Sequence, residues 1–99
     1  MALFLINARD KAGSLELRMA NRPEHLKWAA QFVDRIAMAG PVFLEDGKTM
    51  AGSTFVVEFD TLDDAEAWAA NDPYALAGLF DRVEIIPFHW AIGDGKPNG

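Results

Sequence analysis

Two residues with acid–base side chains, His25 and Asp72, carry the chemistry that this sequence is best suited to perform. His25 comes seven and eleven residues before Phe32 and Ile36, a spacing that places all three on one face of a helix. A histidine within an apolar stripe needs a hydrogen-bond partner. Asp72 precedes Pro73, which is typical of the residue that caps a helix. Because a carboxylate that bonds a histidine fixes its tautomer and makes it a stronger base, the two residues predict a general acid–base site.

Each of these residues also has a structural interpretation. His25 could be a buried histidine that bonds a backbone carbonyl, and Asp72 could serve only as a helix cap. Asp34 lies on the opposite side of the same predicted helix and is expected to face solvent.

Four further side chains are candidates for substrate binding. Arg18 and Arg22 are suited to hold a carboxylate or phenolate, although surface roles suit them equally, and Arg9 is expected at the same end of the fold. Ser53 could donate a hydrogen bond to a ligand. Because no nucleophile-elbow motif surrounds Ser53, we do not expect covalent catalysis.

Composition excludes several classes of site and partner. The chain has no cysteine, and its two histidines, His25 and His89, are too few for a convincing metal site, so we expect neither a metal nor another cofactor. A net charge of −6 makes nucleic acid and anionic lipid poor partners. No apolar run approaches the length of a membrane span and the N-terminus lacks a secretory leader, so we predict a cytoplasmic protein.

The elements that must position these residues follow from periodicity and from turn residues. The pattern predicts, in order, a strand at 3–8, a short helical turn at 14–20, a helix at 23–39, a hairpin with arms at 42–45 and 53–60, a helix capped by Thr61 that ends at residue 70, and a strand at 83–92. Pro23 suits the first position of a helix, and Gly40-Pro41 predicts its end. Pro87 removes a backbone donor, so the last strand should lie at an edge of the sheet.

The order βαββαβ predicts a ferredoxin-like α+β fold, with two helices on one face of a four-stranded antiparallel sheet. We expect one domain over residues 1–92 and a flexible tail at 93–99. In this topology the segments that carry Arg9, His25, Ser53 and Asp72 meet at one end of the sheet. Apolar residues also occupy the face that the helices do not cover, so we expect a homodimer. The residues concerned are Leu3, Leu5, Val56, Phe88 and Trp90.

Several short segments, spread over nearly the whole chain, match a known family in order. They are Asp10-Lys11, residues 14–18, residues 22–26, Ala39-Gly40-Pro41, Gly52-Ser53, Ala67-Trp68, Asp72-Pro73-Tyr74 and Pro87-Phe88. As a set, these segments resemble the YciI-like, or YCII-related, family of small proteins. The resemblance implies a ferredoxin-like fold that pairs into a dimeric α/β barrel, with an active site that contains a histidine and an aspartate, here His25 and Asp72. One relative is a dehydrochlorinase that acts on a chlorinated hydroxyhydroquinone, and muconolactone isomerases share the architecture.

Two functions are consistent with the sequence. The first is a cofactor-independent lyase or isomerase, in which His25 moves a proton on a small aromatic or enol-like substrate, Asp72 orients His25, and Arg18 or Arg22 holds the substrate's charge. The second is a non-catalytic module that binds a small molecule and in which the histidine is structural. An open cavity beside His25 would favour the enzyme, and a closed one would favour the module.

Overall fold

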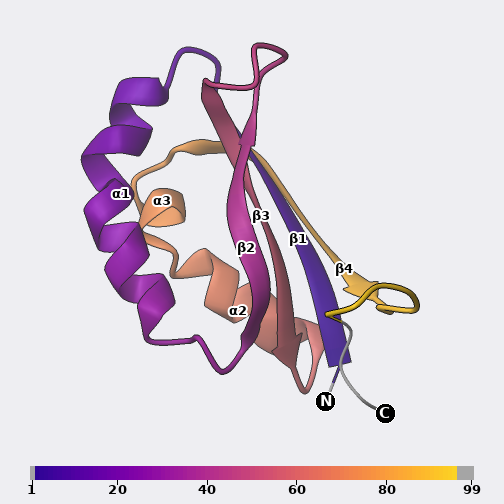
Figure 1. Cartoon of the computed structure of the whole chain (residues 1–99). Helices are drawn as coiled ribbons and strands as arrows, with labels where there is room; N and C mark the ends of the chain where they lie inside the picture. Colours follow the sequence, from indigo (N-terminus) through magenta and orange to yellow (C-terminus); the bar gives the residue numbers. More distant parts are fainter. Residues whose placement is uncertain (1, 96–99) are drawn as a thin grey trace.

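The computed structural model describes residues 2–95 as a four-stranded antiparallel sheet with helices packed on one face (Figure 1). Its elements are β1 (Ala2–Asp10), α1 (Leu15–Ala30), β2 (Ile36–Phe43), β3 (Met50–Phe59), α2 (Leu62–Ala70), α3 (Pro73–Leu76) and β4 (Phe80–Phe88). The strand order β2-β3-β1-β4 is that of the predicted ferredoxin-like fold, which is confirmed. None of the helices within residues 2–95 is long and apolar enough to span a membrane.

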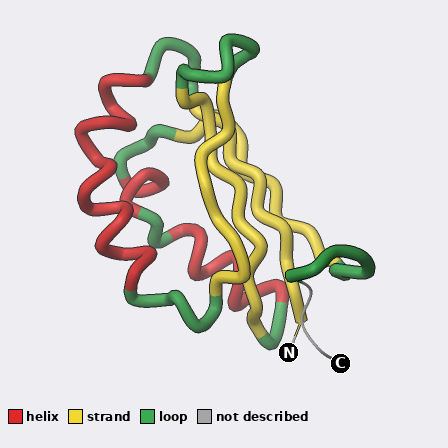
Figure 2. The backbone as a smooth tube through the Cα atoms, in the orientation of Figure 1, coloured by secondary structure: helices red, strands yellow, loops and turns green. Residues whose placement is uncertain are grey.

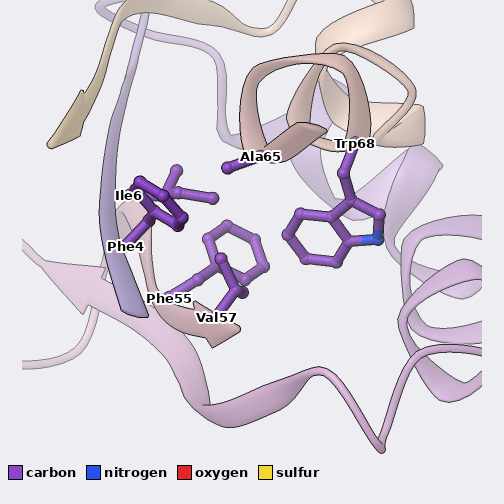
Figure 3. Close-up of a cluster of buried hydrophobic side chains, with 6 residues drawn as sticks. All are labelled: Phe4, Ile6, Phe55, Val57, Ala65 and Trp68. Atoms are coloured by element: carbon purple, nitrogen blue, oxygen red, sulfur yellow. The ribbon is translucent and has the colours of Figure 1, made fainter. Parts of the chain in front are cut away.

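The core lies between the helix layer and the two central strands (Figure 2). Alternate residues of β1 and β3 point toward the helices, as the period of two in a strand requires. Trp68 and Ala65 of α2 cover them, as Figure 3 shows. The buried members of this cluster are Phe4, Ile6, Phe55, Val57, Ala65 and Trp68.

The prediction of a helix at residues 23–39 was wrong at both ends, because α1 begins at Leu15 and ends at Ala30. Pro23 lies inside α1 rather than at its first position, so the turn predicted at 14–20 is the beginning of the same helix. At the C-terminal end, the spacing of apolar residues wrongly suggested that the helix continues past Ala30. Phe32 packs on the core, but it does so from the turn after α1. His25 therefore lies about three turns into the helix, not in its first turn.

Gly40 and Pro41 do not end a helix but occupy β2, which starts at Ile36. A proline is tolerated there because β2 is an edge strand of the sheet. Pro87 lies in β4 at the other edge, as predicted. The hairpin turn is held by Asp46, whose carboxylate accepts hydrogen bonds from the backbone N–H groups of Lys48 and Thr49.

The last strand lies earlier in the chain than the predicted 83–92, at Phe80–Phe88. It ends there because Phe88 pairs with Leu3, close to the start of β1. Of the tail predicted at 93–99, residues 96–99 lie outside the described part of the chain.

The sheet face opposite the helices presents apolar side chains to solvent. Strand register places Leu5, Val56 and Ile86 side by side on this face, where Ile86 is 42% exposed while Val56 is buried beneath its neighbours at 4%. Met38 and Phe88, at 51% and 39% exposed, belong to the same face. We propose that a second copy of the chain covers it, since contiguous apolar surface of this kind marks an interaction site.

Static light scattering should accordingly give about twice the chain mass of 10.9 kDa. Ile86→Lys should shift the protein toward monomer, because dimer formation would bury the charged lysine against the apolar face of the partner. Val83→Lys is the matched control, since Val83 is 44% exposed on the same strand but points to the helix face. A monomeric wild type, or equal dissociation by both variants, would contradict this interface.

Candidate functional site

His25 and Asp72 meet across the helix face of the sheet. The Nδ1 atom of His25 lies 2.8 Å from Oδ1 of Asp72, so the predicted proximity of the two residues is confirmed. The same Oδ1 atom accepts a hydrogen bond of 2.9 Å from the backbone N–H of Tyr74, which makes Asp72 the predicted N-cap of α3 with Pro73 at the first helical position. The short cap therefore fixes the carboxylate in the orientation at which it meets the histidine.

This arrangement determines which ring nitrogen of His25 is left for chemistry. An ionised carboxylate can only accept, so Nδ1 carries the proton in the bond to Asp72. Nε2 makes no hydrogen bond with any residue in the described part of the chain. The side chain of His25 is 12% exposed and lines a pocket of about 300 Å³ between α1 and strands β2 and β3. The cavity beside His25 is thus open.

Three of the four predicted binding residues, Arg18, Arg22 and Ser53, line this pocket. Arg9 does not, and its assignment to the site was wrong. Because side chains alternate along β1, Ala8 faces the helices and Arg9 faces the opposite side. There it lines a separate small pocket with Arg82 of β4.

Arg18 is buried, with 2% of its surface exposed, and it is fully engaged. Its guanidinium bonds both carboxylate oxygens of Asp10, Nε to Oδ2 at 2.7 Å and Nη2 to Oδ1 at 3.0 Å. Nη2 also donates to Oγ of Ser53 at 2.9 Å. Burial disfavours the charged guanidinium, but the bonds and the charge of Asp10 outweigh it and raise the pKa of Arg18. Ser53 accepts from Arg18, so its own hydroxyl proton is free to be donated.

Arg22 differs from Arg18 in that its guanidinium has no hydrogen bond or ion pair with any residue of the stretch from 2 to 95. Its charge reaches the site, since it is one of the groups that act on Tyr74. The pocket therefore holds one neutralised arginine and one uncompensated arginine.

Tyr74 joins these groups and was not among the predicted site residues. Its ring stacks on the imidazole of His25, with centroids 4.1 Å apart and planes inclined by 15°. The guanidinium carbon of Arg18 lies 4.4 Å from the centre of the same ring. Tyr74 is therefore packed between a guanidinium and an imidazole. Asp10, the partner of Arg18, was also missed; both residues occur in the segments that carry the family resemblance, which was the available indication.

The side chains of the site are suited to acid–base chemistry. Within residues 2–95, no group of three or more histidine, cysteine or acidic side chains is placed to hold a metal ion. His25 offers one free ring nitrogen to a pocket with an arginine charge at its wall. Such a centre can take a proton from a small anion or return one to it.

Tyr74 is the one tyrosine of the chain, so its ionisation can be followed by phenolate absorbance. Burial raises its pKa, and the charges of Arg18 and Arg22 only partly oppose this. The phenol of Tyr74 should ionise at a higher pH in the native protein than in the urea-unfolded chain. The folded state favours the protonated phenol of Tyr74, because its pKa is raised there. The contribution of this phenol to the free energy of unfolding is therefore complete below its ordinary pKa of about 10, and it is lost as the pH rises through the pKa of the folded state. Tyr74→Phe should abolish the absorbance step. A native midpoint at or below the unfolded one would refute this environment.

Known proteins share this sequence and fold. The chain is 41% identical to protein YciI of Escherichia coli O6:H1, across 87% of this chain and 95% of that protein, and 36% identical to an uncharacterised protein of Haemophilus influenzae, across 86% and 94%. Among solved structures, it is similar to 5-chloro-2-hydroxyhydroquinone dehydrochlorinase from Burkholderia phenoliruptrix AC1100 in complex with 2,5-dihydroxybenzoquinone. That similarity has a TM-score of 0.80 and 31% identity, over 96% of this chain and 99% of that one.

The profile of the YCII-related domain matches residues 2–89, which contain every residue of the pocket beside His25. Together with the relatives just described, this match shows that the chain belongs to the YciI-like family of YCII-related domain proteins.

Proposed function

We propose that this protein is a cofactor-independent enzyme of the lyase or isomerase type, in which His25 performs general acid–base chemistry on a small hydroxylated aromatic or enol-like anion. The observation that carries the proposal is the bond of 2.8 Å between Nδ1 of His25 and Asp72, which leaves Nε2 unbonded on a side chain that lines a pocket. In this role Nε2 takes a proton from the substrate, and Asp72 stabilises the imidazolium that forms. The same nitrogen returns the proton, either to the substrate or to a departing group.

The charge pattern supports an anionic substrate. Arg18 is neutralised by Asp10, so the positive charge left for a ligand is that of Arg22. A guanidinium suits a phenolate or enolate because its flat array of donors can bond one or two oxygens at once. Ser53 contributes a hydroxyl donor at the same wall of the pocket.

Similarity to the dehydrochlorinase favours the same class of substrate. That relative acts on a hydroxylated, chlorinated ring and was solved with 2,5-dihydroxybenzoquinone, a flat molecule with acidic hydroxyl groups. A single ring of that size is compatible with a pocket of about 300 Å³.

A non-catalytic binding module remains the second candidate, and a specific contact favours it. Asp72 also caps α3 through the N–H of Tyr74, so the carboxylate has a structural task whether or not His25 is a base. The two candidates make different predictions for variants that keep the cap.

Asp72→Asn is the informative variant, because asparagine caps a helix as well as aspartate does. For a ring substrate turned over by the wild type, His25→Ala and Asp72→Asn should each lower kcat about a hundredfold or more. The double variant should be little worse than either single one, since the two groups act as a unit. Circular dichroism should show that the variants remain folded. Full turnover in folded His25→Ala would refute His25 as the acid–base residue, whereas a wild type that binds ring molecules without converting them would favour the module.

A binding experiment tests the role of Arg22. 2,5-Dihydroxybenzoquinone should raise the melting temperature of the wild type, because a ligand that binds only the folded state stabilises it. Arg22→Gln should weaken its binding about tenfold, which is the expected effect of losing one charged hydrogen bond. Arg9→Gln removes an equal charge from the opposite face of the sheet and should leave binding unchanged. Equal losses in both variants would show a general charge effect rather than a contact.

A further inference from the structure

A second pocket lies on the other side of Asp72. It has a volume of about 340 Å³ and is an open depression lined mainly by α2, α3 and strands β1 and β4, with Trp28 of α1 and Phe55 of β3. Asp72 lines this pocket and not the first one, whereas His25 lines the first and not this one. The hydrogen-bonded pair thus joins two separate pockets, one at each of its ends.

The carboxylate of Asp72 has one oxygen left for this second pocket. Oδ1 accepts both the bond from His25 and the bond from the Tyr74 N–H, and Oδ2 has no partner among the described residues. Asp72 as a whole is 2% exposed, but Oδ2 is not among the buried side-chain atoms that lack a partner, so this oxygen keeps some contact with solvent. Because Asp72 lines this pocket, an unpartnered oxygen that still reaches solvent can accept a hydrogen bond from a molecule bound there.

The remaining lining is mainly apolar. Ile6, Phe55, Val83 and Ile85 of the sheet face Trp68 of α2 across the pocket. The indole N–H of Trp68 is buried and is the one buried side-chain polar atom in residues 2–95 without a hydrogen-bond partner. The other acidic residue of the lining, Glu66, is exposed, and no basic side chain lines the pocket. The first pocket prefers anions and this one repels them.

We propose that this second pocket is a binding site for a small neutral molecule with one apolar ring and a hydroxyl group, which donates a hydrogen bond to Oδ2 of Asp72. A hydroxyl suits the site because it can donate a hydrogen bond to a carboxylate oxygen. The volume is ample, since an apolar cavity of about 150 Å³ is enough to bind benzene. The site does not depend on the proposed reaction, because it uses the free oxygen of Asp72.

Occupation of this pocket acts on His25 through Asp72. A donor on Oδ2 withdraws negative charge from the carboxylate and weakens the bond that Oδ1 makes with Nδ1. The linkage is reciprocal, so an anion bound beside His25 changes the affinity of the second pocket by the same factor. The molecule bound there is therefore an effector of the first pocket.

Phenol is the probe for this site, and its binding is followed by chemical-shift titration. Binding should be saturable and should move the Nδ1 resonance of His25, which is read without overlap in the His89→Gln background. Toluene has the same ring without the hydroxyl and should bind about tenfold more weakly, the cost of a lost hydrogen bond to a charged group. Benzoate should not compete with phenol. Equal binding of toluene, or displacement of phenol by benzoate, would overturn the proposed ligand class.

Matched variants locate the site. Val83→Phe fills the second pocket from the exposed end of β4 and should weaken phenol binding about tenfold or more, while Ala39→Phe fills the pocket beside His25 and should not. Ala70→Leu narrows the second pocket from α2 and serves if Val83→Phe does not fold. If Ala39→Phe loses phenol binding while Val83→Phe and Ala70→Leu keep it, phenol binds beside His25 and the proposal is overturned.

Discussion

The burial of one charge, that of Arg18, constrains the rest of the site. A guanidinium with 2% of its surface exposed is tolerable only if its charge is matched, and Asp10 matches it with two hydrogen bonds. That pair connects the end of β1 to the first turn of α1, and the bond to Ser53 adds β3. Tyr74 then packs on the guanidinium and His25 packs on Tyr74. The orientation of the imidazole thus depends on an ion pair that it does not touch.

The layered architecture was predictable because hydrophobic periodicity and turn residues agreed for most elements. Helix α2 was predicted to its last residue: Thr61 accepts from the N–H of Asp64, and Trp68 points inward. The errors in the bounds of α1 and β2 have two origins. Local sequence rules predict that a helix starts at Pro23 and has ended by Pro41. In the folded protein, α1 continues through Pro23, and the edge strand β2 contains Pro41. Phe32 and Ile36 prolonged the apparent helix because they reach the same core from a turn and a strand.

The sequence predicted which residues of the site lie near one another better than it predicted which way their side chains point. The proximity of His25 and Asp72 was predicted from chain order, but that argument placed His25 in the first turn of its helix, whereas it lies about three turns into α1 and meets Asp72 at the N-cap of α3. Side-chain direction could not be obtained in that way. A shift of one position along β1 decides that Ala8 and not Arg9 faces the helices, and it turned a proposed binding residue to the other face. The stack on Tyr74 needs coordinates, because the seven-residue spacing places Arg18 and His25 on one face of α1 but no spacing rule connects either of them to Tyr74.

The prolines of the two edge strands have a consequence for how this chain can meet its own copies. An edge strand offers unpaired N–H groups to any extended segment, which is the usual route to endless sheets. Pro41 on β2 and Pro87 on β4 each delete one donor from the outermost rows of this sheet. Growth by adding strands is thereby interrupted at both margins, while the flat surface between them keeps its apolar side chains. The edges of the sheet therefore oppose growth into fibres, and the apolar face is the surface left for the pairing of two copies that we propose.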